Sequence, residues 1–381
     1  MFRFFKKVDY TKNMPVLDGL RGIAILFIVF FHTIKFIPKS NFEHYYFNFN
    51  RALWVGVDLF FVLSGFLITG ILLETKNRKK YFKNFYMKRF LRIFPLYYLF
   101  IVFSIFVLPQ LFISSDLKID TASALNNQVW YWAYLSNFLG MKEGLTHIFL
   151  GPTWSLAIEE QFYLIWPIFV YLLTKNRLLV TSVVLIILSN LLRLYLYHKS
   201  GYSDTAIYVF TLTRLDPLLI GAVIAVLIRK DCFIKLSKYA VLVFFVSLYF
   251  LVQMHLENNY LYKNKIDVIN YGYLLIAICF GSLLYILLSL KENNIISKIF
   301  SLKFLKFFGK YSYALYLFNQ PIVFIVKHYI FDPKKNQSIF GERLLSQFWF
   351  TFLVLSISVV LSILSWNLFE KHFNRLKKKF N

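Results

Sequence analysis

Two ionisable residues, Arg21 and His32, stand inside the first apolar run of the chain, LDGLRGIAILFIVFFH. Ionisable side chains are costly inside a bilayer, so each is expected to face a bundle interior and to have a reason for its position. Eleven residues are three helical turns plus about 20°, which places the pair on one helix face, roughly 16 Å apart along the axis. A neutral imidazole can accept a proton near pH 7, so His32 is the candidate general base. The alternative is a core histidine that only hydrogen-bonds a neighbouring helix.

Two carboxylates are predicted near the depth of His32. Asp58 in WVGVDLFFVLSGFLITG and Glu159 in GPTWSLAIEEQFYLIWP lie close to the outer ends of their helices. Asp58 could orient or polarise the imidazole, or pair with an arginine and so remain buried. Glu159 and Glu160 point about 100° apart on a helix, so only one can face a shared cavity, and we choose Glu159. Ser64 is disfavoured as a covalent nucleophile, because no strand-to-helix elbow surrounds it.

Two further pairs of charged residues belong to apolar helices, one at the start of its helix and one about a third of the way in. The segment MKRFLRIFPLYY places Arg89 and Arg92 one turn apart on one face, at the predicted cytoplasmic interface. Their two forked guanidinium groups suit phosphates such as those of CoA. The alternative is that the two arginines only flank a membrane span on its cytoplasmic side and contact lipid headgroups. In TLTRLDPLLIGA, Arg214 and Asp216 are candidates for substrate binding. Their alternative is mutual or interhelical charge pairing.

These residues require a membrane-embedded scaffold of helices. The chain has 381 residues, of which 58% are hydrophobic and 16% charged. Apolar stretches of about 20 residues, long enough to cross a bilayer, recur along it. We predict an all-α, polytopic bundle forming one membrane domain over residues 1–381, with a core of about 17–370. The expected spans are residues 17–37, 52–74, 93–113, 154–174, 178–197, 206–228, 239–256, 268–290, 311–331 and 344–369. Residues 128–150 are either a further span or an interfacial or re-entrant helix.

The net charge of +24 is read as a topology signal. Lys and Arg gather in the segments that the positive-inside rule assigns to the cytoplasm, so both termini are predicted to be cytoplasmic. The strongest anchors are the eight Lys/Arg of residues 76–92 and the tail KHFNRLKKKFN. A compact basic face with groove-reading partners is missing, so no nucleic acid is expected. The first span is expected to be uncleaved, Cys232 and Cys279 to form no disulfide, and no metal to bind.

Six segments, read in order from Leu17 to Glu370, resemble the acyltransferase 3 family of integral-membrane O-acyltransferases. They are LDGLRGIAILFIVFFH, GVDLFFVLSGFLI, RFLRIFPLYY, WSLAIEEQFYLIWP, RLDPLLIGA and YSYALYLFNQP. The resemblance implies a ten-helix bundle that takes acyl-CoA from the cytoplasm, with activity dependent on Arg21, His32, Arg89 and Arg92. Family members acylate surface polysaccharides, lipopolysaccharide, peptidoglycan units or small molecules such as macrolides.

The chain departs from the family pattern in two places. Members often have His where this chain has Asn319, an amide that cannot titrate, so Asn319 is left out of the predicted catalytic set. Some members carry a C-terminal extracytoplasmic domain, whereas no fused domain is expected here. The acceptor would then be modified in the bundle or through a separate extracytoplasmic partner protein.

The predicted protein is an inner-membrane (plasma-membrane) O-acetyltransferase. It would move acetyl from cytoplasmic acetyl-CoA to a hydroxyl of a surface polysaccharide, lipopolysaccharide or related glycan, with lipid as its other partner. The main alternative is a proton-coupled transporter or flippase of a glycan pathway, because such carriers also bury ionisable residues near the midplane. A third reading is a non-catalytic assembly subunit. The acyl group, the acceptor and the oligomeric state are left open.

Overall fold

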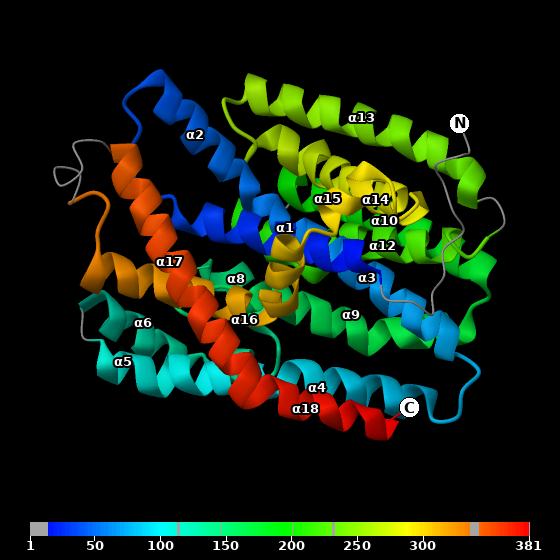
Figure 1. The fold of residues 1–381 in the computed structure, drawn as a ribbon, viewed down its shortest axis with the longest axis horizontal. Coiled ribbons are helices and arrows are strands. Elements are labelled where there is room, and N and C mark those ends of the chain that lie inside the picture. The colour runs from blue at the N-terminus through cyan, green and yellow to red at the C-terminus, as the bar shows by residue number, and fades with distance from the viewer. Residues whose placement is uncertain are drawn as a thin grey trace.

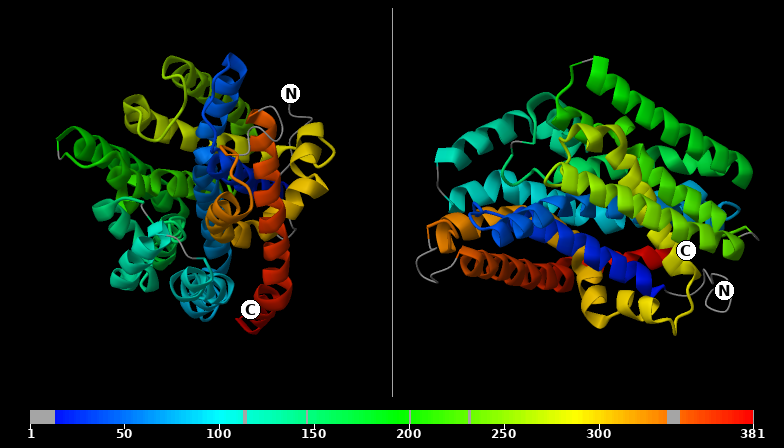
Figure 2. Two further views of the ribbon diagram at one scale, coloured as in Figure 1. Left: turned by 90° about the vertical axis from the view of Figure 1, so that its left-hand side faces the viewer. Right: turned by 90° about the horizontal axis from the view of Figure 1, so that it is seen from above.

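The computed structural model describes residues 14–112, 115–145, 147–199, 201–230, 233–335 and 343–380. Within these ranges the chain is made of helices and their connections, without a β-strand. Most of the long helices run roughly along the longest axis of the molecule, and α17 crosses them obliquely (Figures 1 and 2). The all-α fold class is confirmed. Cys232, which is predicted to form no disulfide, lies outside the described residues. Cys279 is a free, buried thiol.

Each of the ten predicted spans overlaps a helix of the structure. Seven helical stretches of the described chain are long and apolar enough to cross a membrane, which makes this a multi-pass membrane protein. The count of ten crossings and the cytoplasmic termini stay predictions. The ten helices are α1 Pro15–Thr33, α3 Gly56–Thr75, α4 Tyr81–Val102, α9 Thr153–Leu172, α10 Lys175–Lys199, α12 Leu215–Leu227, α13 Phe233–Glu257, α14 Tyr273–Ser289, α16 Lys303–Ile325 and α17 Arg343–Ser365.

Short helices fill the connections between these ten. Helix α2, Asn41–Ala52, was not predicted; a reciprocal capping box between Ser40 and Glu43 opens it. Residues 128–150 contain α7, Gln128–Trp132, and α8, Ser136–Glu143. Eight residues of helix reach only about 12 Å, so neither can cross a bilayer, which favours the interfacial or re-entrant alternative. The other short helices are α5 Leu108–Leu111, α6 Ser115–Asn126, α11 Asp204–Val209, α15 Ile295–Phe300 and α18 Lys371–Leu376.

Helix α1 ends at Thr33, four residues earlier than predicted. Its C-cap residue Ile34 has an extended backbone, and no helix resumes before Asn41. Lys35 therefore lies in a loop beyond the helix. This loop and α2 lie toward the left-hand end of the molecule in Figure 1, away from α18.

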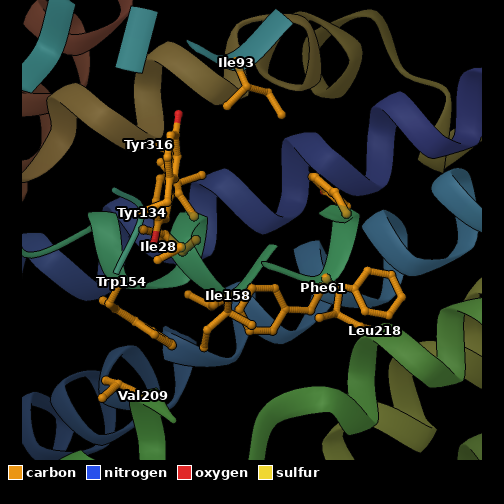
Figure 3. Close-up of a cluster of buried hydrophobic side chains, with 14 of the residues drawn as sticks. Ile28, Phe61, Ile93, Tyr134, Trp154, Ile158, Val209, Leu218 and Tyr316 are labelled. Carbon is orange, nitrogen blue, oxygen red and sulfur yellow. The ribbon is translucent and has the colours of Figure 1, made fainter. Parts of the chain in front are cut away.

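Small residues let the central helices approach closely. A Cβ on Gly22 would lie 2.0 Å from the carbonyl oxygen of Leu305, and one on Gly65 would lie 1.8 Å from that of Leu218. Backbones can come this near only where a side chain is absent, as is usual where helices pack in membranes. These contacts fix α1 against the segment that begins α16, and α3 against α12. Around them a buried apolar cluster joins α1, α3, α4, α9, α12 and α16 (Figure 3).

Candidate active site

The structure places Arg21 and His32 at two separate cavities along α1. Arg21 lines an inner cavity of about 180 Å³, and His32 lines an outer cavity of about 250 Å³. The predicted rise of roughly 16 Å between the two residues is realised by one unbroken helix. Polar and charged residues of the inner cavity are Arg21, Ser64, Arg89, Arg92, Ser155, Glu159, Tyr163, Ser312, Tyr313 and Tyr316. The outer cavity is lined by Phe31, His32, Ile34, Lys35, Phe47, Arg51, Tyr262, Gln320 and Val323.

Three arginines from two helices line the inner cavity. Arg89 and Arg92 lie one turn apart on α4, as predicted, and Arg21 reaches the cavity from α1. Arg21 donates to Asp18 on its own helix at 2.7 Å, and the Arg89 guanidinium lies 5.4 Å from the centre of the Tyr163 ring. Guanidinium groups are well suited to phosphate oxygens, because their forked N–H groups match them in geometry. The arrangement fits a polyphosphate ligand.

Glu159 belongs to the inner cavity and does not contact His32. Its carboxylate accepts a hydrogen bond of 2.5 Å from Ser64 Oγ, in a cavity that it shares with the three arginines. The prediction that Glu159 and His32 lie at the same depth is therefore wrong, because the two residues line different cavities. The contact also gives Ser64 a partner that could accept its proton, although the sequence supplied no reason to favour this serine.

Asn319 holds the His32 ring. His32 Nδ1 lies 2.8 Å from Asn319 Oδ1, and Asn319 is fully buried in α16. With the amide oxygen facing Nδ1, the hydrogen bond forms in the tautomer that carries its proton on Nδ1 and keeps on Nε2 the lone pair that a base needs. The sequence analysis set Asn319 aside because an amide cannot titrate. The signal that could have found it was an amide within the mostly apolar run YSYALYLFNQP, because a buried polar side chain needs a hydrogen-bond partner.

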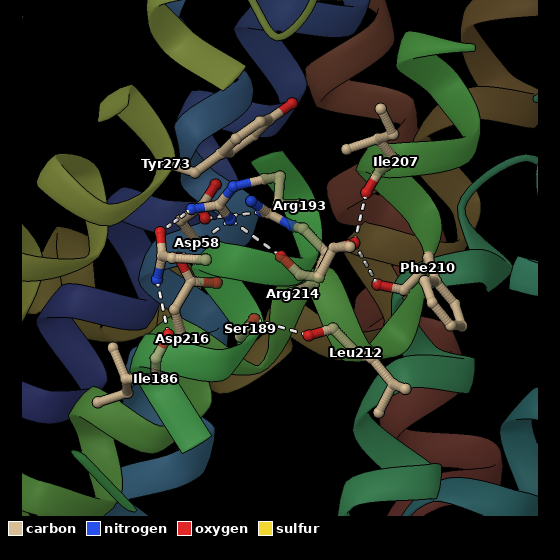
Figure 4. Close-up of polar contacts among 12 residues, drawn as sticks. Asp58, Ile186, Ser189, Arg193, Ile207, Phe210, Leu212, Arg214, Asp216 and Tyr273 are labelled. Atoms are coloured by element: carbon tan, nitrogen blue, oxygen red, sulfur yellow. Dashed lines mark hydrogen bonds and ion pairs between the residues drawn. The ribbon is translucent and has the colours of Figure 1, made fainter. Parts of the chain in front are cut away.

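Asp58 forms an ion pair with an arginine and does not contact His32. Arg214 Nη2 donates to Asp58 Oδ1 at 2.7 Å, and both side chains are fully buried (Figure 4). At the start of α3, Gly56 packs against the carbonyl of Ala24, about two turns before His32 on α1. Asp58 follows Gly56 toward the inner end, so it lies below the imidazole and not level with it. The arginine-pairing alternative describes the observed geometry.

Asp216 and Arg214 also form interhelical pairs. Arg193 of α10 donates to Asp216 at 3.2 Å and to the Thr213 carbonyl at 2.9 Å, while Arg214 bonds Asp58. The centre of the Tyr273 ring lies 4.9 Å from the Arg193 guanidinium and 4.5 Å from that of Arg214. Neither Arg214 nor Asp216 lines the two cavities, so the pairing alternative again matches the structure. Arg193 was missed, though a lone arginine within an apolar helix is itself a sign of a buried partner.

The predicted site residues thus fall into three groups. Arg21, Arg89, Arg92 and Glu159 meet at the inner cavity. His32 stands at the outer cavity, and Asp58, Arg214 and Asp216 tie α3, α10 and α12 together. The catalytic and binding roles assigned to these residues stay predictions.

A hydrogen-bonded pair in the wall of the inner cavity lies one helical turn from the residue that holds His32. Ser155 and Tyr316 line the inner cavity, and their hydroxyl oxygens are 2.5 Å apart. Tyr316 stands three residues before Asn319 on α16, about one turn from the residue that holds His32.

Fold and site together define a multi-pass membrane protein with an arginine-lined cavity and a partly buried histidine along one helix. A family model described as an acyltransferase domain matches residues 14–367. The chain belongs to the acyltransferase 3 family, as its sequence motifs predict.

Curated relatives come from Staphylococcus aureus. O-acetyltransferase OatA of strain NCTC 8325 / PS 47 is 29% identical over 351 residues, covering 86% of this chain and 53% of the relative. Putative O-acetyltransferase SAS0844 of strain MSSA476 is 29% identical over 394 residues, covering 98% of this chain and 59% of the relative. The chain therefore spans just over half the length of these relatives. No solved structure matches it.

Proposed function

We propose that the protein is an O-acetyltransferase that moves acetyl from cytoplasmic acetyl-CoA to a hydroxyl of a cell-surface glycan. The observation that carries this proposal is the placement of a three-arginine cavity and a histidine cavity along one helix, α1. The names of the relatives, both O-acetyltransferases, support the reaction class. A polysaccharide, lipopolysaccharide or related glycan is the acceptor proposed here.

In this mechanism the inner cavity binds the donor. The CoA phosphates contact Arg89, Arg92 and Arg21, and the thioester arm extends past Ser155 and Tyr316 toward His32. Three cations suit the charge of the donor, and the surrounding apolar wall suits its uncharged arm. The donor then enters from the cytoplasm, and an inner (plasma) membrane location follows.

The outer cavity would carry out the chemistry. His32 Nε2 removes the proton of the acceptor hydroxyl as its oxygen attacks the thioester carbonyl, because Asn319 holds the proton of the imidazole on Nδ1. The tetrahedral intermediate collapses, the carbon–sulfur bond breaks, and the imidazolium returns the proton to the CoA sulfur. The products are the acetyl ester and free CoA. Hydrogen-bond donors near the carbonyl oxygen would stabilise its developing charge.

Transfer from radiolabelled acetyl-CoA to surface glycan tests the proposal in membranes with matched protein levels. The variant His32→Gln should lose roughly 100-fold or more of the transfer rate and keep acetyl-CoA binding, because a general base typically contributes that much. Arg89→Gln should raise the KM for acetyl-CoA. Arg78→Gln, which changes an exposed arginine in the loop before α4, is the matched control and should behave as wild type.

Two outcomes would count against the proposal. Unchanged transfer in His32→Gln would remove His32 as the base. Wild-type protein that moves a glycan precursor across the membrane and never labels it would favour the transporter alternative.

A further inference from the structure

The outer cavity combines cations and aromatic rings beside the proposed base. Lys35 and Arg51 supply two positive charges, and Phe31, Phe47 and Tyr262 supply apolar rings. Among the described residues that line it, none is Asp or Glu. A cavity with two cations and no lining carboxylate favours an anionic occupant.

Arg51 is held by rings and not by an acid. Its guanidinium carbon lies 4.3 Å from the centre of the Tyr262 ring, 4.8 Å from that of Tyr260 and 5.5 Å from that of Phe47. Cation–π contacts fix the position of a guanidinium and leave its N–H donors available. Within the described chain, the ion pairs of the structure include neither Arg51 nor Lys35.

Two other arginines of the bundle differ from Arg51, because each has an acidic partner. Arg193 and Arg214 are neutralised by Asp216 and Asp58 where they join helices. A buried cation needs a compensating charge, since its desolvation is costly otherwise. At the outer cavity that compensation is missing, although Arg51 is only partly exposed. A ligand that brings its own negative charge would supply it.

We propose that the outer cavity binds a glycan that carries a carboxylate or phosphate beside the hydroxyl to be acetylated. Arg51 and Lys35 bind this anion, and the rings of Phe47 and Tyr262 pack against the apolar faces of the sugars. Lys35 follows His32 by three residues, so the anion lies next to the reacting hydroxyl. The inference rests on the proposed function and names the class of its acceptor.

A chemically altered acceptor tests the proposal directly. Surface glycan from the producing organism is de-O-acetylated with mild alkali and divided in three: one part untreated, one with its carboxylates converted to amides, and one with its phosphodiesters cleaved by hydrofluoric acid. Transfer from radiolabelled acetyl-CoA is measured on each part with the full-length protein. We expect kcat/KM to fall roughly 10- to 100-fold on the part whose anion has been removed, as for a lost hydrogen bond to a charged group. The part affected identifies the anion as carboxylate or phosphate.

Variants tie the effect to the cavity. Arg51→Gln and Lys35→Gln should raise the KM for the untreated glycan and match wild type on the neutralised one, whereas Arg51→Lys should keep most of the affinity. Lys39→Gln is the control, because Lys39 is an exposed lysine of the same loop and does not line the cavity. Equal transfer to all three glycans, or an unchanged KM in both Gln variants, would overturn the proposal.

A binding measurement separates this inference from the proposed reaction. If wild type labels none of the glycans, the proposed function fails, and direct binding of the same three glycans to the protein decides the inference alone. If wild type prefers the anionic glycan and Arg51→Gln loses this preference, the inference is upheld. Equal binding of all three, with displacement by phosphatidylglycerol vesicles, would make the cavity a lipid-headgroup site and refute it.

Discussion

At the scale of single residues, an amide decides how His32 can react. Asn319 is a pure acceptor toward Nδ1, at 2.8 Å, and so leaves Nε2 as the basic nitrogen. Asn319 is thus a positioning residue that acts through His32.

Replacing Asn319 should therefore alter turnover and not donor binding. In Asn319→Leu the ring loses its partner, and we expect kcat to fall roughly 10- to 100-fold with the KM for acetyl-CoA within about twofold, since one orienting hydrogen bond is removed. Asn319→Asp keeps an acceptor oxygen and should restore most of the loss. Steady-state acetyl transfer measures both, and equal activity in the Leu variant would exclude the orienting role.

The ionisation of Lys35 should make acceptor binding depend on pH. Burial, together with the charges of Lys327 and Lys334, lowers the pKa of Lys35 to about 8. The ammonium is charged below this pH and neutral above it, so the KM for an anionic acceptor should rise between pH 7 and pH 9. Arg51 and His32 line the same cavity as Lys35. In Lys35→Arg the rise should disappear, and a KM that rises equally in that variant would assign the effect to another group.

At the scale of elements, close helix contacts hold the two cavities in register. Arg21 and His32 keep their separation because α1 is continuous, and α3 and α16 bring Ser64 and Asn319 to opposite ends of it. The position of α3 depends on Gly65, whose backbone touches that of Leu218. Backbone contacts of this kind tolerate no added atoms.

The variant Gly65→Ala should destabilise the bundle. Its Cβ would meet a backbone carbonyl that cannot rotate away, and overpacking of this sort costs about 1–3 kcal/mol or more. Gly140→Ala is the control, because the atom nearest to its Cβ is the terminal Cδ2 methyl of Leu145, 3.2 Å away, which can move. Thermal unfolding of the detergent-solubilised protein, followed by size-exclusion chromatography, should show a lower Tm for Gly65→Ala only. Equal Tm values for the two variants would contradict the close contact.

At the scale of the whole molecule, charge and hydropathy set the orientation in the membrane. Basic residues gather between α3 and α4 and at the C-terminal end, whereas α2 lies toward the other end of the bundle (Figure 1). The positive-inside rule then predicts that the arginine cavity faces the cytoplasm and the histidine cavity the outside.

Cysteine labelling tests this orientation. In a background without Cys232 and Cys279, Lys39→Cys should react with a membrane-impermeant maleimide in intact cells. Lys79→Cys, in the turn between α3 and α4, should react only after permeabilisation, because the reagent cannot cross the bilayer. Labelling of Lys79→Cys in intact cells would contradict the predicted topology.

The sequence by itself determined the fold class, the membrane setting, the family and the grouping of Arg89 and Arg92, with Arg21, at one depth. These follow from local properties: apolar runs of bilayer length, the 3.6-residue period that aligns Arg21 with His32, and the one-turn spacing of Arg89 and Arg92. Such features depend on neighbours along one helix and can be read from one segment at a time.

Only the tertiary structure decided which helix supplies each partner. Asp58 could reach either His32 or an arginine, and the contact between Gly56 and α1 sets its depth and pairs it with Arg214. Arg193 meets Asp216, and Asn319 meets His32 across 287 positions of sequence. The physical reason is that a helix fixes the direction of its side chains, while the depth and rotation of one helix against another come from packing along its whole length.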